Sequence, residues 1–239
     1  MTDDLPASLS YRLDGPVAVV TLDDGKANAT GPAEIAGLAA LLARAEREAT
    51  ALVVAGNARV FSAGFDLAVM TESVTSMRSL VTAGGRMWMG LYGSPLPTVS
   101  ACTGHALAGG AVTLLSTDER IGPSDAPAKV GLSEVAIGMP LPEFVVALAR
   151  ERLSPRHLTR AVLGTVFTPA EAVEVGYLDR LVPQADVVES AVARAHELAA
   201  LAPVAVGRTK TTLRRPTIDG VLGRIDDDMA TIVPPNPGG

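Results

Sequence analysis

The run GHALAGGAVTLL, Gly104–Leu115, places two adjacent glycines where a strand should give way to a buried helix. Glycine costs about 1 kcal/mol relative to alanine inside a helix, so the pair needs a reason. A strand, then glycines, then a helix N-terminus is a common way to present backbone N–H groups to a negatively charged atom. Alternatively, Gly109 and Gly110 only let a helix pack closely on a strand, and the glycines alone favour that interpretation.

Three known motifs do not fit this run. Gly104 and Gly109 have the spacing of a phosphate-binding P-loop, but Gly110 and Ala111 stand where Lys and Ser or Thr are required. The dinucleotide fingerprint GxGxxG and the nucleophile elbow GxSxG are both absent from the sequence. A nucleotide cradle and a serine nucleophile are therefore not predicted here.

A second segment, FSAGFDL (Phe61–Leu67), also follows a strand and also places a glycine at a tight turn. With GHALAGG downstream and a glutamate beyond it, the sequence resembles the crotonase (enoyl-CoA hydratase/isomerase) superfamily. The resemblance covers most of the chain, because it also takes in GKANA (25–29), PTVSACTGHALAGG (97–110), VGLSEVAIGMP (130–140) and TPAEAVEVGYLDRLV (168–182). No single motif decides the matter; their order and spacing together are specific.

The resemblance implies an oxyanion hole built from two backbone amides, those of Phe65 and Gly109. Removing a proton from the carbon beside a thioester builds negative charge on the carbonyl oxygen. Fixed N–H donors aimed at that oxygen stabilise the enolate by several kcal/mol in a dry site, and the dipole of the following helix adds to this. Glycine is needed because a Cβ would block close approach of the ligand.

The number of glutamates that the resemblance implies distinguishes two reactions of the family. Family members that hydrate enoyl-CoA use two glutamates, and those positions are Val112 and Glu134 in this chain. One acid is therefore missing. Shifting a double bond needs only one group, which acts first as base and then as acid, so the resemblance predicts an enoyl-CoA isomerase with Glu134 as its proton shuttle. Burial among Val130, Leu132, Val135 and Ile137 should raise the pKa of Glu134 toward neutrality.

Two other functions stay open. Glu143 could enter the pocket, replace the missing acid and restore hydration; it could also sit in the first turn of the next helix, where a negative charge is favoured anyway. A non-catalytic acyl-CoA binder would keep the oxyanion hole without the chemistry. His105 is a lone histidine in an apolar run, which is typical of a packed residue, and we assign it no role.

The substrate-binding residues that we expect by resemblance are Lys26, Ala27, Ala29, Ala63, Gly64, Asp66, Leu67 and Gly110. Lys26 either reaches a phosphate of coenzyme A or lies in a solvated turn, and Asp66 should hold its own loop through backbone N–H groups. The Met-rich stretch 70–89 with Trp88 lines the acyl pocket or packs in the core. Coenzyme A is expected as part of the substrate, with no permanently bound cofactor and no metal.

Alternating strand and helix patterns must position these residues. Strands are predicted at 17–22, 51–55, 98–102 and 178–182, with short strands near Ile121 and Lys129–Val130. Helices are predicted from Pro32, over 141–153, from the Thr168–Glu171 capping box to Gly176, and over 185–201 and 203–215, while 70–89 is expected as irregular helix. This is an α/β pattern with a helical C-terminal region, and the resemblance specifies a crotonase-like ββα spiral core.

Composition limits the partners. The 239 residues are 48% hydrophobic and carry a net charge of −6, which suits a globular protein and argues against a nucleic-acid partner. One cysteine, no signal-peptide pattern and no apolar run of the length of a membrane span predict a cytoplasmic protein.

The resemblance also predicts how the chain is divided and assembled. Residues 1–185 should form the spiral core with the acyl-CoA site, and residues 186–239 a helical oligomerisation region. A homotrimer or a dimer of trimers is expected, with Lys210, Arg214 and Arg215 near the phosphates of coenzyme A.

Overall fold

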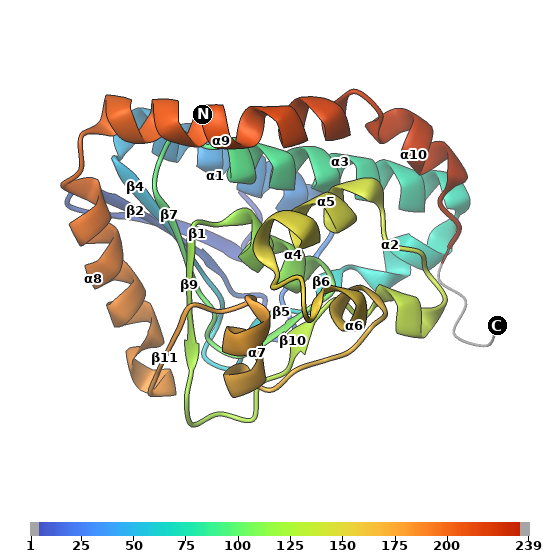
Figure 1. Ribbon diagram of the computed structural model, residues 1–239, viewed down its shortest axis with the longest axis horizontal. Helices are drawn as coiled ribbons and strands as arrows, with labels where there is room; N and C mark the ends of the chain where they lie inside the picture. The colour runs from blue at the N-terminus through green and yellow to red at the C-terminus, as the bar shows by residue number, and fades with distance from the viewer. Residues whose placement is uncertain (1–4, 235–239) are drawn as a thin grey trace.

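The largest sheet is built from the β-branched runs that the sequence predicts as strands. A computed structural model describes residues 5–234 (Figure 1). Its six strands lie in the order β1 (Leu9–Asp14), β2 (Val17–Leu22), β4 (Ala51–Ala55), β7 (Thr98–Ala101), β9 (Glu119–Pro123) and β11 (Arg180–Val182). Only β1 is antiparallel to its neighbour, and the β2 and β4 strands pair in parallel with Val19 opposite Val53. This sheet is the scaffold on which the site is placed.

Two small parallel sheets connect segments that are distant in the sequence. β3 (Ala29–Thr30) pairs with β6 (Gly64–Phe65), and β8 (His105–Leu107) lies between β5 (Val60–Ser62) and β10 (Val130–Gly131). They bring together GKANA, FSAGFDL, GHALAGG and VGLSEVAIG, four of the five segments that carry the resemblance.

Helices cover both sides of the large sheet (Figure 1). They are α1 (Pro32–Glu48), α2 (Leu67–Glu72), α3 (Val74–Gly93), α4 (Gly109–Ser116), α5 (Glu143–Arg152), α6 (Leu158–Val162), α7 (Pro169–Val175), α8 (Val187–Ala199), α9 (Pro203–Leu222) and α10 (Ile225–Thr231), with 3-10 turns η1 (Glu134–Ile137) and η2 (Gln184–Asp186). The capping box of Thr168 and Glu171 opens α7, and Gly176 ends it in the left-handed conformation, as predicted.

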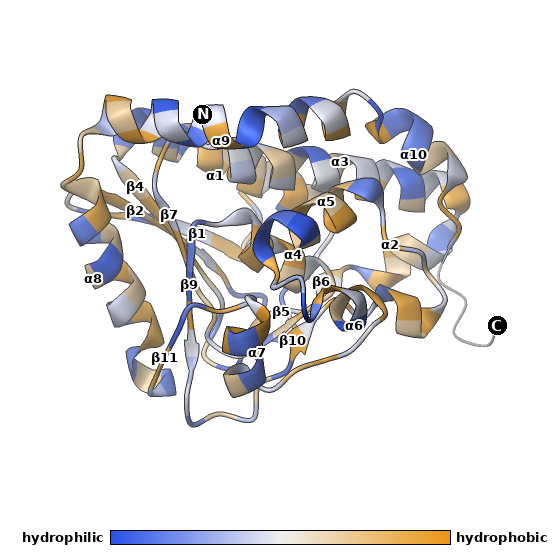
Figure 2. Cartoon of the chain, in the orientation of Figure 1, coloured by the Kyte–Doolittle hydropathy of each residue, from blue (hydrophilic) through white to orange (hydrophobic). Residues whose placement is uncertain are grey.

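The two faces of the sheet bury separate cores. One core packs α8, through Val187, Ala191 and Ala195, against strands β2, β4, β7 and β9. The larger core lies on the other face beneath α1, α3, α4 and α5. Figure 2 shows largely apolar strands next to helices that carry both polar and apolar residues. The proposed division of the chain at residue 185 stays a prediction.

Some expected elements differ from the structure. The Met-rich stretch is two regular helices, α2 and α3, and not irregular helix, because the Ser73 hydroxyl accepts from the Ser76 amide and caps a new helix. α9 continues past residue 215 to Leu222 with Pro216 inside it. Among the described residues, no helix combines the length and the apolar character needed to cross a lipid bilayer.

The cations of α9 are used inside the fold. Lys210 and Arg214 are buried, and both pair with Asp118, at 2.6 and 2.5 Å. Arg214 also donates to the Tyr92 carbonyl at 2.7 Å, and burial lowers the pKa of Lys210 to about 8. The expectation that these two side chains meet the phosphates of coenzyme A is therefore wrong: they attach α9 to the rest of the fold.

Candidate active site

A cavity of about 400 Å³ lies where the small sheets meet α3, α4, η1 and α5. The lining is mostly apolar and includes Ala27, Ala29, Ala63, Phe65, Leu67, Met70, Trp88, Gly109, Val112 and Glu134. We call it the site cavity. Concave apolar pockets with a few convergent polar groups are the usual form of small-molecule sites.

The two glycine turns touch each other at the site cavity. A Cβ on Gly64 would lie 2.8 Å from the Gly109 nitrogen, and a Cβ on Gly109 would lie 3.1 Å from the Gly64 Cα and 2.8 Å from the Trp88 ring. Gly64 also has a φ of +94°, which L side chains rarely adopt. The amides of Phe65 and Gly109 are thus brought together by backbone contact that only glycine allows.

The direction of the Phe65 amide follows from the pairing of its strand. Thr30 Oγ1 donates to the Gly64 carbonyl at 3.1 Å, and the Asp66 amide donates to the Thr30 carbonyl at 3.1 Å. Alternate amides of a parallel strand point to opposite sides, so the Phe65 N–H lies on the side away from β3. The Phe65 N–H is therefore not needed by the sheet and can serve as a donor.

The Gly109 amide is the first of helix α4. Amides of the first helical turn have no partner within the helix and carry the positive end of its dipole. The Ala108 amide donates to the Gly131 carbonyl at 3.0 Å, which joins this helix start to β10, three residues before Glu134. This arrangement can hold a negatively charged oxygen beside a carboxyl group.

Ala108 has a strained backbone, with φ +48° and ψ −121°. An L residue pays about 1–3 kcal/mol for such a conformation, and glycine does not. Ala108→Gly is therefore expected to raise the free energy of unfolding by about 1 kcal/mol, after the entropy that glycine adds to the unfolded chain. Urea denaturation of the two proteins checks this. A loss of stability would show that the Ala108 methyl group contributes more by packing than its backbone costs.

Glu134 is buried in a position where its neighbour is exposed. Glu134 is the first residue of η1 and is 8% exposed, whereas the next residue, Val135, is 39% exposed. Burial raises the pKa of Glu134 to about 7, and the backbone amides of Ser133 and Glu134 offset part of that rise. Oε2 is buried and has no hydrogen-bond partner among the described residues. A buried carboxyl with a pKa near neutrality can both take and return a proton.

Glu134 is the only carboxyl group among the described residues that line the site cavity. Val112, at the position expected for the first of the two glutamates of hydratases, lines the same cavity and is 1% exposed. Glu143 does not reach it. Its carboxylate lies in the first turn of α5, pairs with Arg224, and has a pKa held below its usual range by that guanidinium. Glu143 therefore does not replace the missing acid.

The structure divides the expected substrate-binding residues into two groups. Ala27, Ala29, Ala63 and Leu67 line the site cavity with Phe65 and Gly109. Gly64 and Gly110 lie buried behind it, Asp66 caps α2 by accepting from the Ala68 amide, and Lys26 lines a separate hollow with Arg59, His105 and Gln184. Met77, Met87 and Met89 are buried in the core and do not line the site cavity.

Several residues of the site lie outside the predicted set. Met139, Phe144 and Val145 come from the loop and helix after Glu134, and no local pattern marks them as cavity residues. Asn28 is easier to recognise from the sequence, because it is a polar residue between Ala27 and Ala29, which both line the cavity. Its buried amide donates to the carbonyls of Leu22, Val60 and Phe61 and so fixes the loop that carries Ala27 and Ala29.

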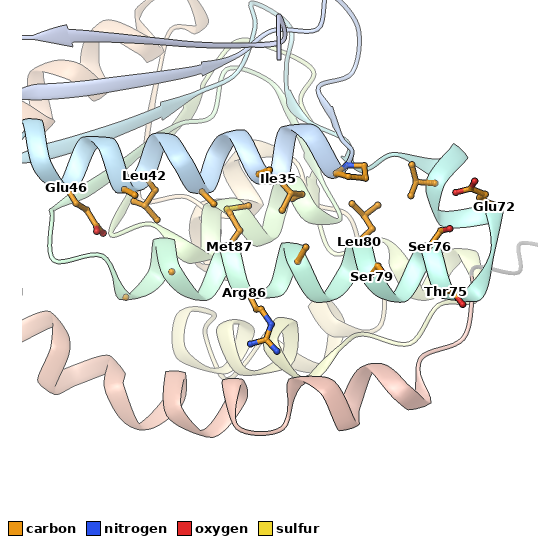
Figure 3. A pocket seen from close by; sticks show the side chains of 18 of the residues that line it. Ile35, Leu42, Glu46, Glu72, Thr75, Ser76, Ser79, Leu80, Arg86 and Met87 are labelled. Carbon is orange, nitrogen blue, oxygen red and sulfur yellow. The ribbon is translucent and has the colours of Figure 1, made fainter. Parts of the chain in front are cut away.

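A larger groove runs over the surface between α1 and α3 (Figure 3). Its volume is about 1130 Å³. Its charged side chains lie along the rim and two of them are engaged elsewhere, since Glu46 accepts from Ser94 and Arg86 pairs with Asp226. We call it the α1/α3 groove. Its lining includes neither the glycine turns nor Glu134, so the site cavity remains the candidate active site.

Residues 12–225 match the enoyl-CoA hydratase/isomerase family. The chain belongs to that family. This confirms the predicted resemblance, and the α/β class with a helical C-terminal region is confirmed by an apo structure of an enoyl-CoA isomerase from Mycobacterium tuberculosis. Its TM-score is 0.89 and its identity 34%, over 94% of this chain and 98% of that one.

Two curated relatives of this chain are named for different activities of the family. Human mitochondrial enoyl-CoA delta isomerase 1 is 32% identical over 176 residues, which is 73% of this chain and 58% of that protein. A putative enoyl-CoA hydratase of Thermus thermophilus is 34% identical over 210 residues, 83% of this chain and 81% of that protein. The chain thus spans about three fifths of the mitochondrial isomerase. These names support the prediction that the chain is an enoyl-CoA isomerase or hydratase.

Proposed function

We propose that this protein is an enoyl-CoA isomerase that moves a double bond from C3–C4 to C2–C3 of an acyl-CoA thioester. The Glu134 carboxylate takes a proton from C2, and the electron pair moves onto the thioester oxygen. The amides of Phe65 and Gly109 hold that oxyanion. Glu134 then returns the proton to C4 as the double bond moves to C2–C3, so the reaction consumes no other reactant.

The observation that carries this proposal is that Glu134 is the single carboxyl group among the described residues that line the site cavity. Hydration calls for one group to activate water and another to protonate carbon, whereas Val112 stands at the first of the two expected glutamate positions and Glu143 is paired with Arg224. An isomerisation needs only Glu134. The name of the human relative is consistent with this choice.

Coenzyme A is proposed to extend from the Ala27 side of the site cavity. Lys26 and Arg59 line a neighbouring hollow of about 470 Å³ and are both exposed. Two cations there can hold phosphate groups while the thioester lies at the glycine turns. Coenzyme A enters and leaves with the substrate in this proposal.

The pH dependence of turnover should report Glu134. The first step needs its ionised form, and burial raises its pKa to about 7. We therefore expect kcat/KM to rise with pH, to be half-maximal near pH 7 and to level off above it, because kcat/KM reports the free enzyme. Initial rates between about pH 5 and pH 9 measure this. A profile that is already level at about pH 5, as an ordinary glutamate with a pKa of about 4.3 would give, would contradict a buried base.

The reaction itself is tested by incubating the protein with 3-enoyl-CoA and, separately, with 2-enoyl-CoA. Absorbance of the conjugated thioester should grow with the 3-isomer, and little should be lost with the 2-isomer. Loss from the 2-isomer at a comparable rate would assign hydration instead. No change with either, at several chain lengths and with tight binding, would leave an acyl-CoA binder.

We also propose a homotrimer, or a dimer of trimers, in the cytoplasm, with residues 186–239 as the oligomerisation region. The resemblance supports this assembly, and sedimentation equilibrium tests it. A monomer at micromolar concentration would overturn it.

A further inference from the structure

Trp88 is fixed in the wall of the site cavity. It is 1% exposed and is the largest fully buried side chain of the described residues. Its ring centroid lies 5.2 Å from that of Phe65 and 5.8 Å from that of Phe144. Its Nε1 donates to Thr113 Oγ1 at 2.9 Å, and that hydroxyl donates to the Gly109 carbonyl at 3.0 Å. The indole is therefore held by stacking and by a hydrogen bond, next to the glycine of the oxyanion hole.

A second, smaller cavity is lined by Thr113, the hydrogen-bond partner of Trp88. It measures about 30 Å³ and is lined almost entirely by apolar side chains, among them Leu38, Leu52, Val54 and Leu91. We call it the inner cavity. An apolar space of this size stays dry and is suited to hydrocarbon.

Three elements form the wall, because neighbouring residues on each of them line different cavities. On α3, Trp88 lines the site cavity and Met87 the inner cavity; on α4, Val112 lines the first and Thr113 the second. Around β5 the same division separates Ala63 from Ser62. The hydrogen bond between Trp88 and Thr113 thus joins one side of the wall to the other.

The inner cavity continues toward the surface. Leu42 and Met87 line both it and the α1/α3 groove, and Figure 3 shows these two side chains between the helices α1 and α3. The inner cavity and the groove are therefore neighbours, and the hydrogen bond from Trp88 to Thr113 links the site cavity to the inner cavity.

We propose that Trp88 sets the upper limit on acyl chain length, by closing the site cavity against the inner cavity. The proposal rests on the proposed function only in that an acyl-CoA thioester occupies the site cavity. A chain that reaches the indole has no further apolar space to enter. A shorter side chain at this position joins the two cavities and lets the chain extend toward α1.

The test measures dissociation constants of saturated acyl-CoAs from butanoyl- to dodecanoyl-CoA, so that no turnover is needed. Each methylene buried contributes about 0.8 kcal/mol, or about fourfold in affinity. Affinity for the wild-type protein should rise with chain length and then stop rising. In Trp88→Leu the limit should move by at least about two carbons, and dodecanoyl-CoA should bind about tenfold tighter or more, while butanoyl-CoA changes little.

Val54→Ile is the matched control, because it fills about one methylene of the inner cavity from β4 and leaves the site cavity untouched. Alone it should not change the affinity series. Combined with Trp88→Leu it should remove about fourfold of the gain for dodecanoyl-CoA, which is a coupling that a merely loosened protein would not show.

Trp88→Phe keeps the aromatic stack and should shift the limit in the same direction by less, so the proposal stays testable if Trp88→Leu fails to fold. An unchanged limit in either folded variant overturns the role of Trp88. A wild-type protein that binds acyl-CoAs without isomerising them overturns the proposed function alone. A protein that binds none of them overturns both.

Discussion

Replacing Glu134 with glutamine is expected to lower turnover by about three orders of magnitude or more. The same carboxyl group both removes and returns the proton in the proposed reaction, and positioned acid–base groups contribute about 10²–10⁴-fold each. Glutamine has nearly the same shape and no ionisable proton. The dissociation constant for a saturated acyl-CoA should change little, since the amides of Phe65 and Gly109 are retained.

Glu143→Gln is the matched control for this experiment. It changes the same residue type nine positions later, in a side chain that pairs with Arg224 and does not line the site cavity. Its turnover should equal that of the wild type. Equal losses in the two variants would show that charge in this region matters only for the fold, and an unaffected rate in Glu134→Gln would remove Glu134 from the mechanism.

Glu134→Gln should also make the protein more stable than the wild type at high pH. Glu134 has its pKa raised to about 7 in the folded chain, above the ordinary value, so folding favours the protonated form. The wild type therefore loses stability as the pH rises from about 4.3 through about 7, by on the order of 3 kcal/mol. Glutamine stays neutral and avoids that loss. Urea unfolding of both proteins near pH 8 and near pH 5 measures the difference, which should be largest near pH 8.

The parts of the fold that could be predicted are those with a strong local signal. β2 and β4 are runs of β-branched and apolar residues, and α7 has both a capping box and a terminal glycine. The two- and three-residue strands β3, β6 and β8 have no such signal, because they exist only through pairing with distant segments. Those short strands bring the site motifs together, so the assembly of the site is the least local property of the sequence.

The site shows a similar limit. Glu134 and the glycine turns stand out through resemblance, but Phe144 and Met139 become cavity residues only when α5 packs beside α3 and α4. For Lys210 and Arg214 the error is the opposite one, because the sequence predicts a role in substrate binding and the structure places them elsewhere. Their charge suggests a phosphate partner, yet the fold provides Asp118 as a buried counter-ion, and sequence spacing cannot reveal a pairing across about 90 residues.

Gly110→Ala is expected to damage the protein although Gly110 does not line the site cavity. A Cβ at this position would lie 2.1 Å from the Ser62 carbonyl oxygen, which belongs to the backbone of β5 and cannot rotate away. Helix α4 would have to move off the strand, and the Gly109 amide would move with it. A displacement of about 1 Å in a catalytic group can cost about 10²-fold in rate, and overpacking costs about 1–3 kcal/mol in stability. Steady-state kinetics and urea unfolding of the variant measure both.

Gly90→Ala separates this effect from the general cost of changing a helical glycine. Gly90 lies in the neighbouring helix α3, and a Cβ there would meet only Leu42 Cδ2 at 3.7 Å, an ordinary contact. That variant should gain up to about 1 kcal/mol from helix propensity and keep its rate. If Gly110→Ala behaved like Gly90→Ala, the close packing of α4 on β5 would not be what aims the Gly109 amide. In the present explanation each glycine excludes a side chain for its own reason, since Gly109 faces the cavity and Gly110 faces the strand. That result would remove the second reason, and the adjacent glycines would need a different explanation.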